Sequence, residues 1–451
     1  MHKTLLVMLT ISLLAACGDD DDAVAGKDAG DDGGSTSDAG ECPSGGDGTL
    51  AIDIEIESGV QAGVRMLRGS SAVGDEITES KSQTLSAGMY QIALRRVRQT
   101  SSLVGPAYQG TVSGAASVCV QKDKTTTVRV VYTREPGSEK LWLTQSNGDG
   151  AQVMAFDADQ LTTLGDQTPA VSLSPKLENV GPIRVDAKGR LWVGTNTGKL
   201  VAFESARLGS MSTAAPNVTL AGKSLCEDSL PCGPRAIAFD GKGALWVATL
   251  TRIVKLAPDS LDASGSPAAA VTIHSDSAKS PQGLAFDGEG NLWVADAEGA
   301  VVKFNAARLA SDVTGAADVV IYAQQPGPVL IGLGGPEGLV FDSDGNLWVG
   351  YFAGNDLVRF SKSELASSAL LDDPIVPARY IKIGAEALVT DLALDEGGNL
   401  WLPGGGGYLY RIAKDQLSSS EPELKRLHSA EVGSVEKISF NTVPGALFIA
   451  P

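Results

Sequence analysis

The side chains of this chain that could bind a ligand or an ion are polar residues at one place in a repeated motif, about five positions ahead of its Asp. They offer carboxylates, amides, a hydroxyl and a guanidinium, the groups that hold divalent cations and orient ligands in pockets. The set consists of Glu178, Asn179, Arg235, Gln282, Glu337, Thr390 and Glu436. We expect one mixed polar ring if the repeated elements bring these positions together.

Motifs of the common hydrolases and nucleotide-binding enzymes do not occur in the sequence. There is no nucleophile elbow, phosphate loop or HExxH motif. Beyond the N-terminal segment the only histidines are His274 and His428, and both fall on predicted outer strands. A Ser-His-Asp triad at the polar ring would therefore lack its base.

The repeated motif is Asp-x-x-Gly-x-Leu-Trp, and its copies stand 47 to 55 residues apart along the C-terminal two-thirds of the chain. This period is typical of propellers or solenoids, and each period contains four strand-like segments, as one propeller blade does. The full motif spans Asp186–Trp192, Asp240–Trp246, Asp287–Trp293, Asp342–Trp348 and Asp395–Trp401, and Leu-aromatic pairs at Leu141-Trp142 and Leu447-Phe448 flank it.

The Asp, Gly and Trp of the motif are interpreted as structural. An Asp side chain can accept hydrogen bonds from the backbone just ahead of it, and Gly tolerates positive φ in a tight turn. The stretch from Asp342 resembles a calcium loop, but Ala353 stands where an EF-hand needs its Glu, so we expect a plain turn. All six tryptophans occupy one repeat position, which predicts burial between blades for Trp142, Trp192, Trp246, Trp293, Trp348 and Trp401.

The ends of the repeat region predict how the ring closes. The first copy lacks a first strand, and residues 437–441 supply one, so the C-terminal strand should complete the first blade. This predicts an all-β fold with a six-bladed β-propeller over residues 138–451, in which 446–450 form an extra terminal strand. A seven-bladed ring, with that terminal hairpin counted as a blade, is the minority alternative. The polar ring then lies at the channel mouth, where propellers bind.

Residues 49–134 lack the repeat and instead alternate apolar and polar residues, which predicts a small antiparallel β-sandwich. The segments 85–90 and 125–132 resemble the prealbumin-like or immunoglobulin-like modules of bacterial surface proteins. We interpret this domain as a spacer rather than a binding module. The basic run 95–98 is expected to be a solvated strand edge.

The N-terminus indicates export. Residues 1–16 read as a signal peptide with a short apolar run, and the junction at 14–17 resembles the lipobox of bacterial lipoproteins, which implies acylation of Cys17. Gly18 favours the outer over the inner membrane of the cell envelope. Residues 17–48 are expected to be a disordered acidic tether, which holds half of the net charge of −18. This acidity excludes nucleic acid as a partner and leaves the lipid as the only membrane contact.

Four further cysteines, an even number in an exported chain, favour disulfides over metal binding or catalysis. Three pairings are possible. We favour Cys226 with Cys232 inside one interblade loop and Cys42 with Cys119 across the sandwich. A zinc site is the alternative.

The segments 281–287 and 336–349 resemble repeats of the regucalcin/gluconolactonase superfamily, and equally NHL-repeat and virginiamycin B lyase propellers, over residues 138–451. In the lactonases a Glu, an Asn and an Asp hold a divalent metal that polarises the lactone. The resemblance implies Glu178, Gln282 and Glu337 as their counterparts, although Gln replaces Asn, Glu replaces Asp, and Arg235 adds positive charge nearby. The lyases use inner-face histidines that have no counterpart here.

The sequence therefore predicts a lipid-anchored surface or periplasmic protein that binds a protein, peptide or glycan through the loop face of a propeller. The long interblade loops 221–233 and 324–335 are the expected contact elements. Such a binding or scaffold protein requires no cofactor. The alternative is a metal-dependent, lactonase-like hydrolase with a divalent cation such as Ca²⁺ in the channel.

Overall fold

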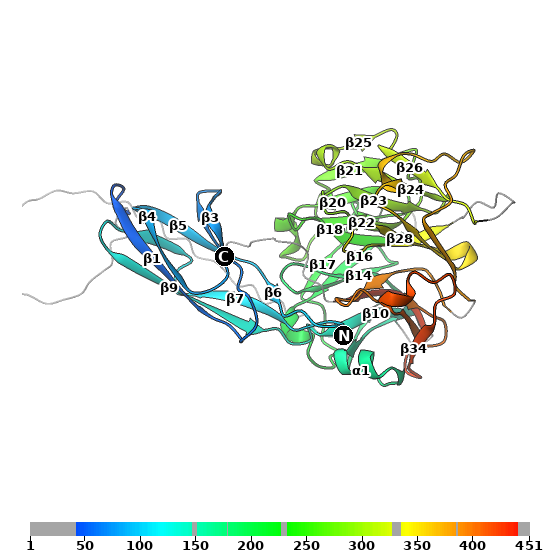
Figure 1. Ribbon diagram of the computed structural model, residues 1–451, viewed down its shortest axis with the longest axis horizontal. Coiled ribbons are helices and arrows are strands. Elements are labelled where there is room, and N and C mark those ends of the chain that lie inside the picture. The colour runs from blue at the N-terminus through cyan, green and yellow to red at the C-terminus, as the bar shows by residue number, and fades with distance from the viewer. Residues whose placement is uncertain are drawn as a thin grey trace, which may run out of the picture. The chain divides into compact units, whose positions relative to one another are not determined.

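The computed structural model describes residues 42–146, 151–177, 179–226, 232–326, 335–384 and 387–440, which belong to one compact unit (Figure 1). The signal peptide, Cys17 and the tether up to residue 41 lie outside the described residues. Within the described part, no helix is both long enough and apolar enough to cross a membrane.

The first nine strands form the sandwich, in two sheets of order β4-β1-β9-β7-β6 and β3-β2-β5-β8. Their bounds are β1 (Asp47–Glu55), β2 (Val64–Arg68), β3 (Ser71–Ile77), β4 (Lys81–Ser86), β5 (Gly88–Leu94), β6 (Val97–Arg98), β7 (Ala107–Ser113), β8 (Ser117–Val120) and β9 (Thr125–Arg134). Leu50 and Ile52 are buried in the core. Asp53, the residue that follows Ile52 in β1, is exposed. The predicted alternation thus separates the core face from the solvent face.

The sequence predicted an antiparallel sandwich, but one pair of its strands is parallel. Strands β1 and β9 pair in parallel, with Thr49 opposite Thr125 and Glu55 opposite Val131. The prediction was wrong here because alternation reports which face of a strand is buried and carries no information on strand direction. Two strands that are not joined by a hairpin are free to pair either way.

The basic run 95–98 is not a solvated edge either. Arg96 is 2% exposed, and its Nε donates to the Glu135 carboxylate at 2.7 Å. The Nη1 of Arg98 lies 2.9 Å from a carboxylate oxygen of Glu396, which belongs to the last of the repeated turns. These arginines therefore bind carboxylates brought from distant parts of the chain, which local sequence cannot indicate.

Both predicted disulfides are confirmed. Cys42 is bonded to Cys119 in β8, and this bond ties the start of the described chain to the sandwich. Cys226 is bonded to Cys232 inside the loop that precedes the third propeller sheet. Disulfides of this kind are typical of exported proteins.

Residues 140–440 form six sheets, each with four antiparallel strands in the order first to fourth. Sheet 1 is β35 (Ser434–Phe440), β10 (Lys140–Ser146), β11 (Ala151–Asp157) and β13 (Val171–Leu177); sheet 2 is β14 (Val180–Val185), β15 (Leu191–Thr195), β16 (Lys199–Phe203) and β17 (Val218–Leu220); sheet 3 is β18 (Ala236–Phe239), β19 (Leu245–Ala248), β20 (Ile253–Leu256) and β21 (Val271–His274). Sheet 4 is β22 (Pro281–Phe286), β23 (Leu292–Asp296), β24 (Ala300–Phe304) and β26 (Val319–Tyr322); sheet 5 is β27 (Pro336–Phe341), β28 (Leu347–Tyr351), β29 (Asp356–Phe360) and β30 (Arg379–Lys382); sheet 6 is β31 (Ala393–Leu394), β32 (Leu400–Pro403), β33 (Tyr408–Ile412) and β34 (Leu424–His428).

Short elements decorate the outer strands. Strand β25 (Val313–Thr314) adds in parallel to β21, and β12 (Gly165–Asp166) adds in parallel to β34. The single α-helix of the described chain, α1 (Ala158–Thr163), begins with a capping box between Asp157 and Gln160. The 3₁₀ turns are η1 (Ser205–Arg207), η2 (Pro258–Leu261), η3 (Ala306–Ala310), η4 (Phe352–Gly354), η5 (Glu364–Ala366) and η6 (Lys414–Gln416).

The C-terminal strand closes the first sheet as predicted. Strand β35 pairs antiparallel with β10, with Leu141 opposite Phe440 and Leu143 opposite Ile438. The two ends of the repeat region are thus joined by backbone hydrogen bonds within one sheet. The terminal segment 446–450 lies outside the described residues, so the choice between six and seven blades stays a prediction.

The motif tryptophans are buried between sheets, as predicted, and each is at most 1% exposed. Trp246 meets Phe286 of the next sheet edge to face, with ring centroids 6.0 Å apart, and Trp293 meets Phe341 in the same way at 6.1 Å. The core of the propeller therefore lies between neighbouring sheets, and each aromatic contact spans two repeats.

The turn Asp has a second role that the sequence did not reveal. In all five full copies its Oδ2 accepts the indole N–H of the motif Trp at 2.9 to 3.2 Å, and its Oδ1 accepts the backbone N–H four residues on. Trp142 belongs to the copy without the Asp, and its Nε1 is buried with no partner among the described residues. The position equivalent to the turn Asp is there Asn441, which lies outside the described residues.

Replacing one turn Asp should expose its double role. Asp287→Ala leaves the buried indole N–H of Trp293 and a turn amide without an acceptor, so we expect a loss of about 1–3 kcal/mol in the free energy of unfolding. Glu289→Ala, at an exposed position of the same turn, should stay within about 0.5 kcal/mol of the wild type. Denaturant titration measures both, and equal losses would contradict the role of the indole bond.

Candidate functional site

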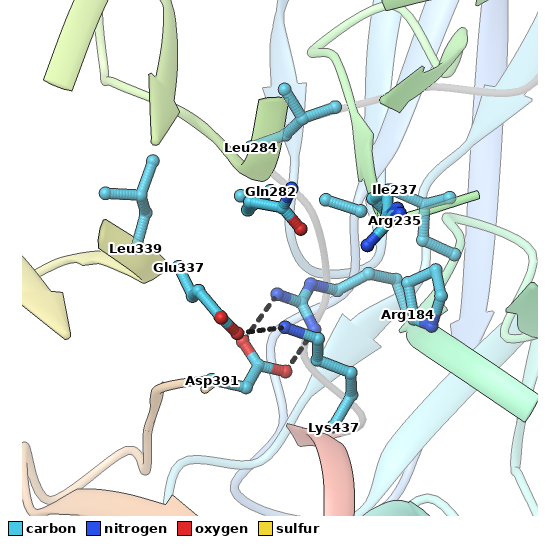
Figure 2. A pocket seen from close by; sticks show the side chains of 12 residues that line it. Arg184, Arg235, Ile237, Gln282, Leu284, Glu337, Leu339, Asp391 and Lys437 are labelled. Carbon is cyan, nitrogen blue, oxygen red and sulfur yellow. Dashed lines mark hydrogen bonds and ion pairs between the residues drawn. The ribbon is translucent and has the colours of Figure 1, made fainter. Parts of the chain in front are cut away.

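The first strands of the sheets and the residues just before them bring three of the predicted ring positions, Arg235, Gln282 and Glu337, to one small cavity (Figure 2). Its volume is about 10 Å³, which is room for about one water molecule. The polar side chains in its wall are Arg184, Arg235, Gln282, Glu337, Asp391 and Lys437. The channel at this level is therefore filled by its own side chains.

An arginine and an aspartate form the centre of this cluster. Both Nη atoms of Arg184 lie 3.3 Å from the two carboxylate oxygens of Asp391, in a bidentate pair. Asp391 is 3% exposed and also accepts the backbone N–H of Ile438 at 3.0 Å. Arg184 donates in addition to the carbonyl oxygens of Ile183 and Ile438. Sheets 2, 6 and 1 thus meet through one ion pair at the axis.

A lysine and a glutamate form a second pair beside the first. The Nζ of Lys437 lies 3.8 Å from a carboxylate oxygen of Glu337 and donates to the carbonyl oxygen of Thr390 at 2.5 Å. Figure 2 shows the side chains of Arg184, Glu337, Asp391 and Lys437 turned toward one another from different strands. The carboxylates here face cations of the chain itself.

Burial raises the pKa of the Glu337 carboxyl above its usual value. The positive charge of Lys437 acts in the opposite direction, and Asp391 adds to the upward shift. Because burial is the largest cause, ionised Glu337 is less favourable in the folded protein than in water, even with the lysine nearby.

The structure brings together only part of the predicted ring. Arg235, Gln282 and Glu337 line the cavity, and the Gln282 amide donates to the hydroxyl of Ser280 at 3.2 Å. Thr390 is linked to the Glu436 carbonyl oxygen at 3.2 Å, so these two lie beside the wall.

The remaining ring positions fall elsewhere. Asn179 is exposed, has φ of 45° and is not among the residues that line the cavity. Glu178 lies outside the described residues, so its predicted place in the ring stays a prediction.

The predicted ring did not include three residues at the centre of the polar cluster, namely Arg184, Asp391 and Lys437. In the aligned first strands Arg184 stands where other copies have Ala, Val or Ser, and Asp391 and Lys437 stand where others have Pro, Ala or Gly. A charge that breaks an otherwise apolar repeat position was the available signal. The predicted ring rests on the polar position that the copies share, and these three charges stand at other positions.

The described residues fit a divalent cation poorly. Arg184, Arg235 and Lys437 bring three positive charges to a space that also holds Glu337 and Asp391. Asp391 already accepts an arginine and a backbone amide. No group of three His, Cys, Asp or Glu suited to a metal ion occurs within the described ranges. His274 and His428 end the fourth strands β21 and β34, at the outer side of their sheets, as predicted.

The loops around the mouth carry apolar side chains into solvent. Leu250 and Phe352, in the connections between second and third strands, are 42% and 47% exposed. The Phe352 amide donates to the Gly335 carbonyl oxygen at 2.9 Å, and Arg252 donates to the Lys223 carbonyl oxygen at 2.7 Å. These connections therefore contact the described ends of the two long loops, whose centres 227–231 and 327–334 lie outside the described residues.

The raised pKa of Glu337 predicts a pH dependence. Its folded pKa lies above the unfolded one, so the stability that this group contributes is full below the unfolded pKa and falls as pH rises through the folded pKa. Glu337→Gln removes that loss, and its melting temperature should exceed that of the wild type by about 1 °C more at about pH 7 than at about pH 4. Glu289→Gln, on an exposed turn, serves as the control, and a difference of opposite sign would show that attraction to Lys437 dominates.

No protein-family model matches the chain, and no curated protein matches it. Among solved structures, the chain is similar to a protein of unknown function from Bacteroides caccae at 12% identity and a TM-score of 0.45, over 67% of this chain and 98% of that one. It is also similar to a streptogramin B lyase at 16% identity and a TM-score of 0.37, over 65% and 84% of the two chains. A catalytically inactive virginiamycin B lyase from Staphylococcus aureus with quinupristin is 16% identical, with a TM-score of 0.37 over 73% and 87%.

Proposed function

We propose that this protein is an exported, lipid-anchored binding or scaffold protein, and that it binds a protein, peptide or glycan through the loop face around the channel mouth. The observation that carries the proposal is the state of the channel. Its carboxylates are paired with the chain's own cations, and its cavity of about 10 Å³ admits no substrate. At this end of the channel, recognition is then left to the loops around the mouth.

The loop face has the features of a binding surface. Leu250 and Phe352 expose large apolar side chains there, and aromatic residues at the centre of an interface supply much of its binding energy. The described ends of the flanking loops have fixed partners, since Cys226 is bonded to Cys232 and the Phe352 amide donates to the Gly335 carbonyl oxygen at 2.9 Å.

Anchoring at the outer membrane of the cell envelope rests on the N-terminal sequence. The lipobox around Cys17 supports acylation, and the acidic segment that follows supports a flexible tether. The sandwich adds a spacer between the tether and the propeller. This arrangement would hold the loop face away from the membrane surface.

The loop face can be tested with defined ligand libraries. The full chain carrying Cys17→Ser, which prevents acylation, is screened on a glycan array and against a random-peptide display library. We expect a selected class whose affinity falls at least about thirtyfold with Leu250→Asp and Phe352→Asp together, which corresponds to about 2 kcal/mol. Leu371→Asp, at a 70% exposed position between β29 and β30, is the matched control. No selected class, or equal losses in the control, would contradict the proposal.

A metal-dependent, lactonase-like activity remains the other candidate, and it has a distinct test. Thermal unfolding is measured with excess Ca²⁺, Mg²⁺, Mn²⁺ or Zn²⁺ for the wild type and Glu337→Ala. A cation at a hundred times its dissociation constant would add about 2.7 kcal/mol of stability. We expect no cation-specific rise, because Arg184, Arg235 and Lys437 repel a cation at this place. A rise that Glu337→Ala abolishes would overturn the binding proposal in favour of the hydrolase.

A further inference from the structure

A second cavity lies at the other end of the propeller channel, on the side of the motif turns. Its volume is about 570 Å³, within the range of about 300–1,000 Å³ that is typical of small-molecule sites. The last residue of each of the six first strands contributes to its wall. These residues are Val185, Phe239, Phe286, Phe341, Leu394 and Phe440, and we call this space the basal cavity.

The wall of the basal cavity is more apolar than polar, and several of its side chains are only partly buried. Phe286 and Phe341 each pack one side of the ring against the Trp of the preceding sheet, at 6.0 and 6.1 Å between centroids. They remain half-buried, as do Phe239 and Leu394. Packing between sheets therefore buries only part of each of these side chains and leaves apolar surface facing the cavity. Contact of this apolar surface with water is unfavourable in free energy.

The charged groups that border the basal cavity are already paired. Arg184 lies in the walls of both cavities, and its guanidinium holds Asp391 in a bidentate pair. At the turns, the Asp240 and Asp287 carboxylates accept indole and backbone N–H groups, and Lys255 lies 3.3 Å from Asp240. Within the described lining, Arg184 and Asp240 have ionic partners and Asp287 is hydrogen-bonded by its own turn, an arrangement that favours neutral molecules over ions.

Access favours a small occupant over a macromolecule. The turn of sheet 6 beside the cavity is covered by residues of the sandwich, since the Glu396 carboxylate accepts the backbone N–H of Ser101 at 2.7 Å and of Gly105 at 3.2 Å. A Cβ on Gly397 would lie 2.2 Å from the Ser102 carbonyl oxygen, which shows how closely that turn is covered. In contrast, a Cβ on Gly241 or Gly288, in the turns of sheets 3 and 4, would meet no atom within 4 Å.

From this geometry we infer that the basal cavity is a binding site for a small, neutral and largely apolar molecule. The molecule would enter past the turns of sheets 3 and 4 and lie against the rings of Phe239, Phe286 and Phe341. This site is separate from the loop face, because the pair of Arg184 and Asp391 fills the axis between the two ends of the channel.

The test uses the neutral fluorescent probe N-phenyl-1-naphthylamine with the full chain carrying Cys17→Ser, so that no acyl chain binds the probe. We expect saturable binding at one site, with energy transfer from tryptophan, since Trp246 and Trp293 contact the cavity wall. Leu394→Asn should weaken binding about tenfold, and Leu394→Met, which keeps the wall apolar, should retain it. Leu371→Asn, on the exposed loop between β29 and β30, should leave binding unchanged.

Two outcomes would overturn the inference. The first is binding that does not saturate, or that Leu371→Asn weakens as much as Leu394→Asn does. The second concerns residues 441–451, which follow Phe440 at the cavity wall and lie outside the described residues. If the probe binds only after these residues are deleted, the occupant is the chain's own C-terminal segment and not a small molecule. Loop-face binding is measured separately, so its failure and the failure of this site are distinguishable.

Discussion

A buried indole N–H needs a hydrogen-bond acceptor. In the propeller of this chain the acceptor is the Asp of the repeated turn, and the other features of the repeat depend on this bond. In each full repeat the turn Asp accepts both the indole N–H and backbone amides of its own turn. One carboxylate thus fixes the turn and sets the Trp of the second strand against the next sheet. An unsatisfied donor in this place would cost about 1–3 kcal/mol, so the Asp stabilises the repeat in addition to the apolar contact. Because the same turn ends the first strand, this bond also positions the residues that line the channel.

In five of the six sheets the indole ring also has a cationic partner. In sheets 3 to 6 the residue opposite the Trp on the third strand is Lys255, Lys303, Arg359 or Arg411, and its cationic group lies 5.1 to 5.9 Å from the ring centroid. In sheet 2 that residue is Ala202, and Arg190 of the turn takes over at 5.3 Å while it also binds Asp186. The contact is thus kept in sheet 2 although the cation comes from another position, whereas in sheet 1 the residue opposite Trp142 is Ala155.

Much of this architecture could be predicted, and the failures have a common cause. Periodicity predicted the position of the tryptophans, the closing strand β35 and, with the cysteine count, both disulfides. The parallel pairing of β1 with β9 and the burial of Arg96 were not predictable, because each depends on a partner far away in the chain. The prediction of the candidate site was incomplete for the same reason. Shared polar positions predicted part of the ring, whereas the pair of Arg184 and Asp391 joins two exceptions to the repeat that become neighbours only when the ring closes.

That ion pair also determines what the channel can do. Removing a well-paired charge from water is costly, and the cost is offset only when every partner is in place, as it is for Asp391 with one guanidinium and a backbone amide. The Asp391 carboxylate is stable because its oxygens already accept these hydrogen bonds. A carboxylate whose oxygens are occupied in this way is a poor metal ligand or base. The polar cluster therefore separates the channel into two ends with different chemistry. One end presents loops with exposed Leu250 and Phe352, and the other presents a cavity with more apolar than polar wall, whose bordering charged groups are hydrogen-bonded or ion-paired. A closed propeller with a filled axis gains rigidity from the pair, so the accessible surfaces of its channel are its two ends.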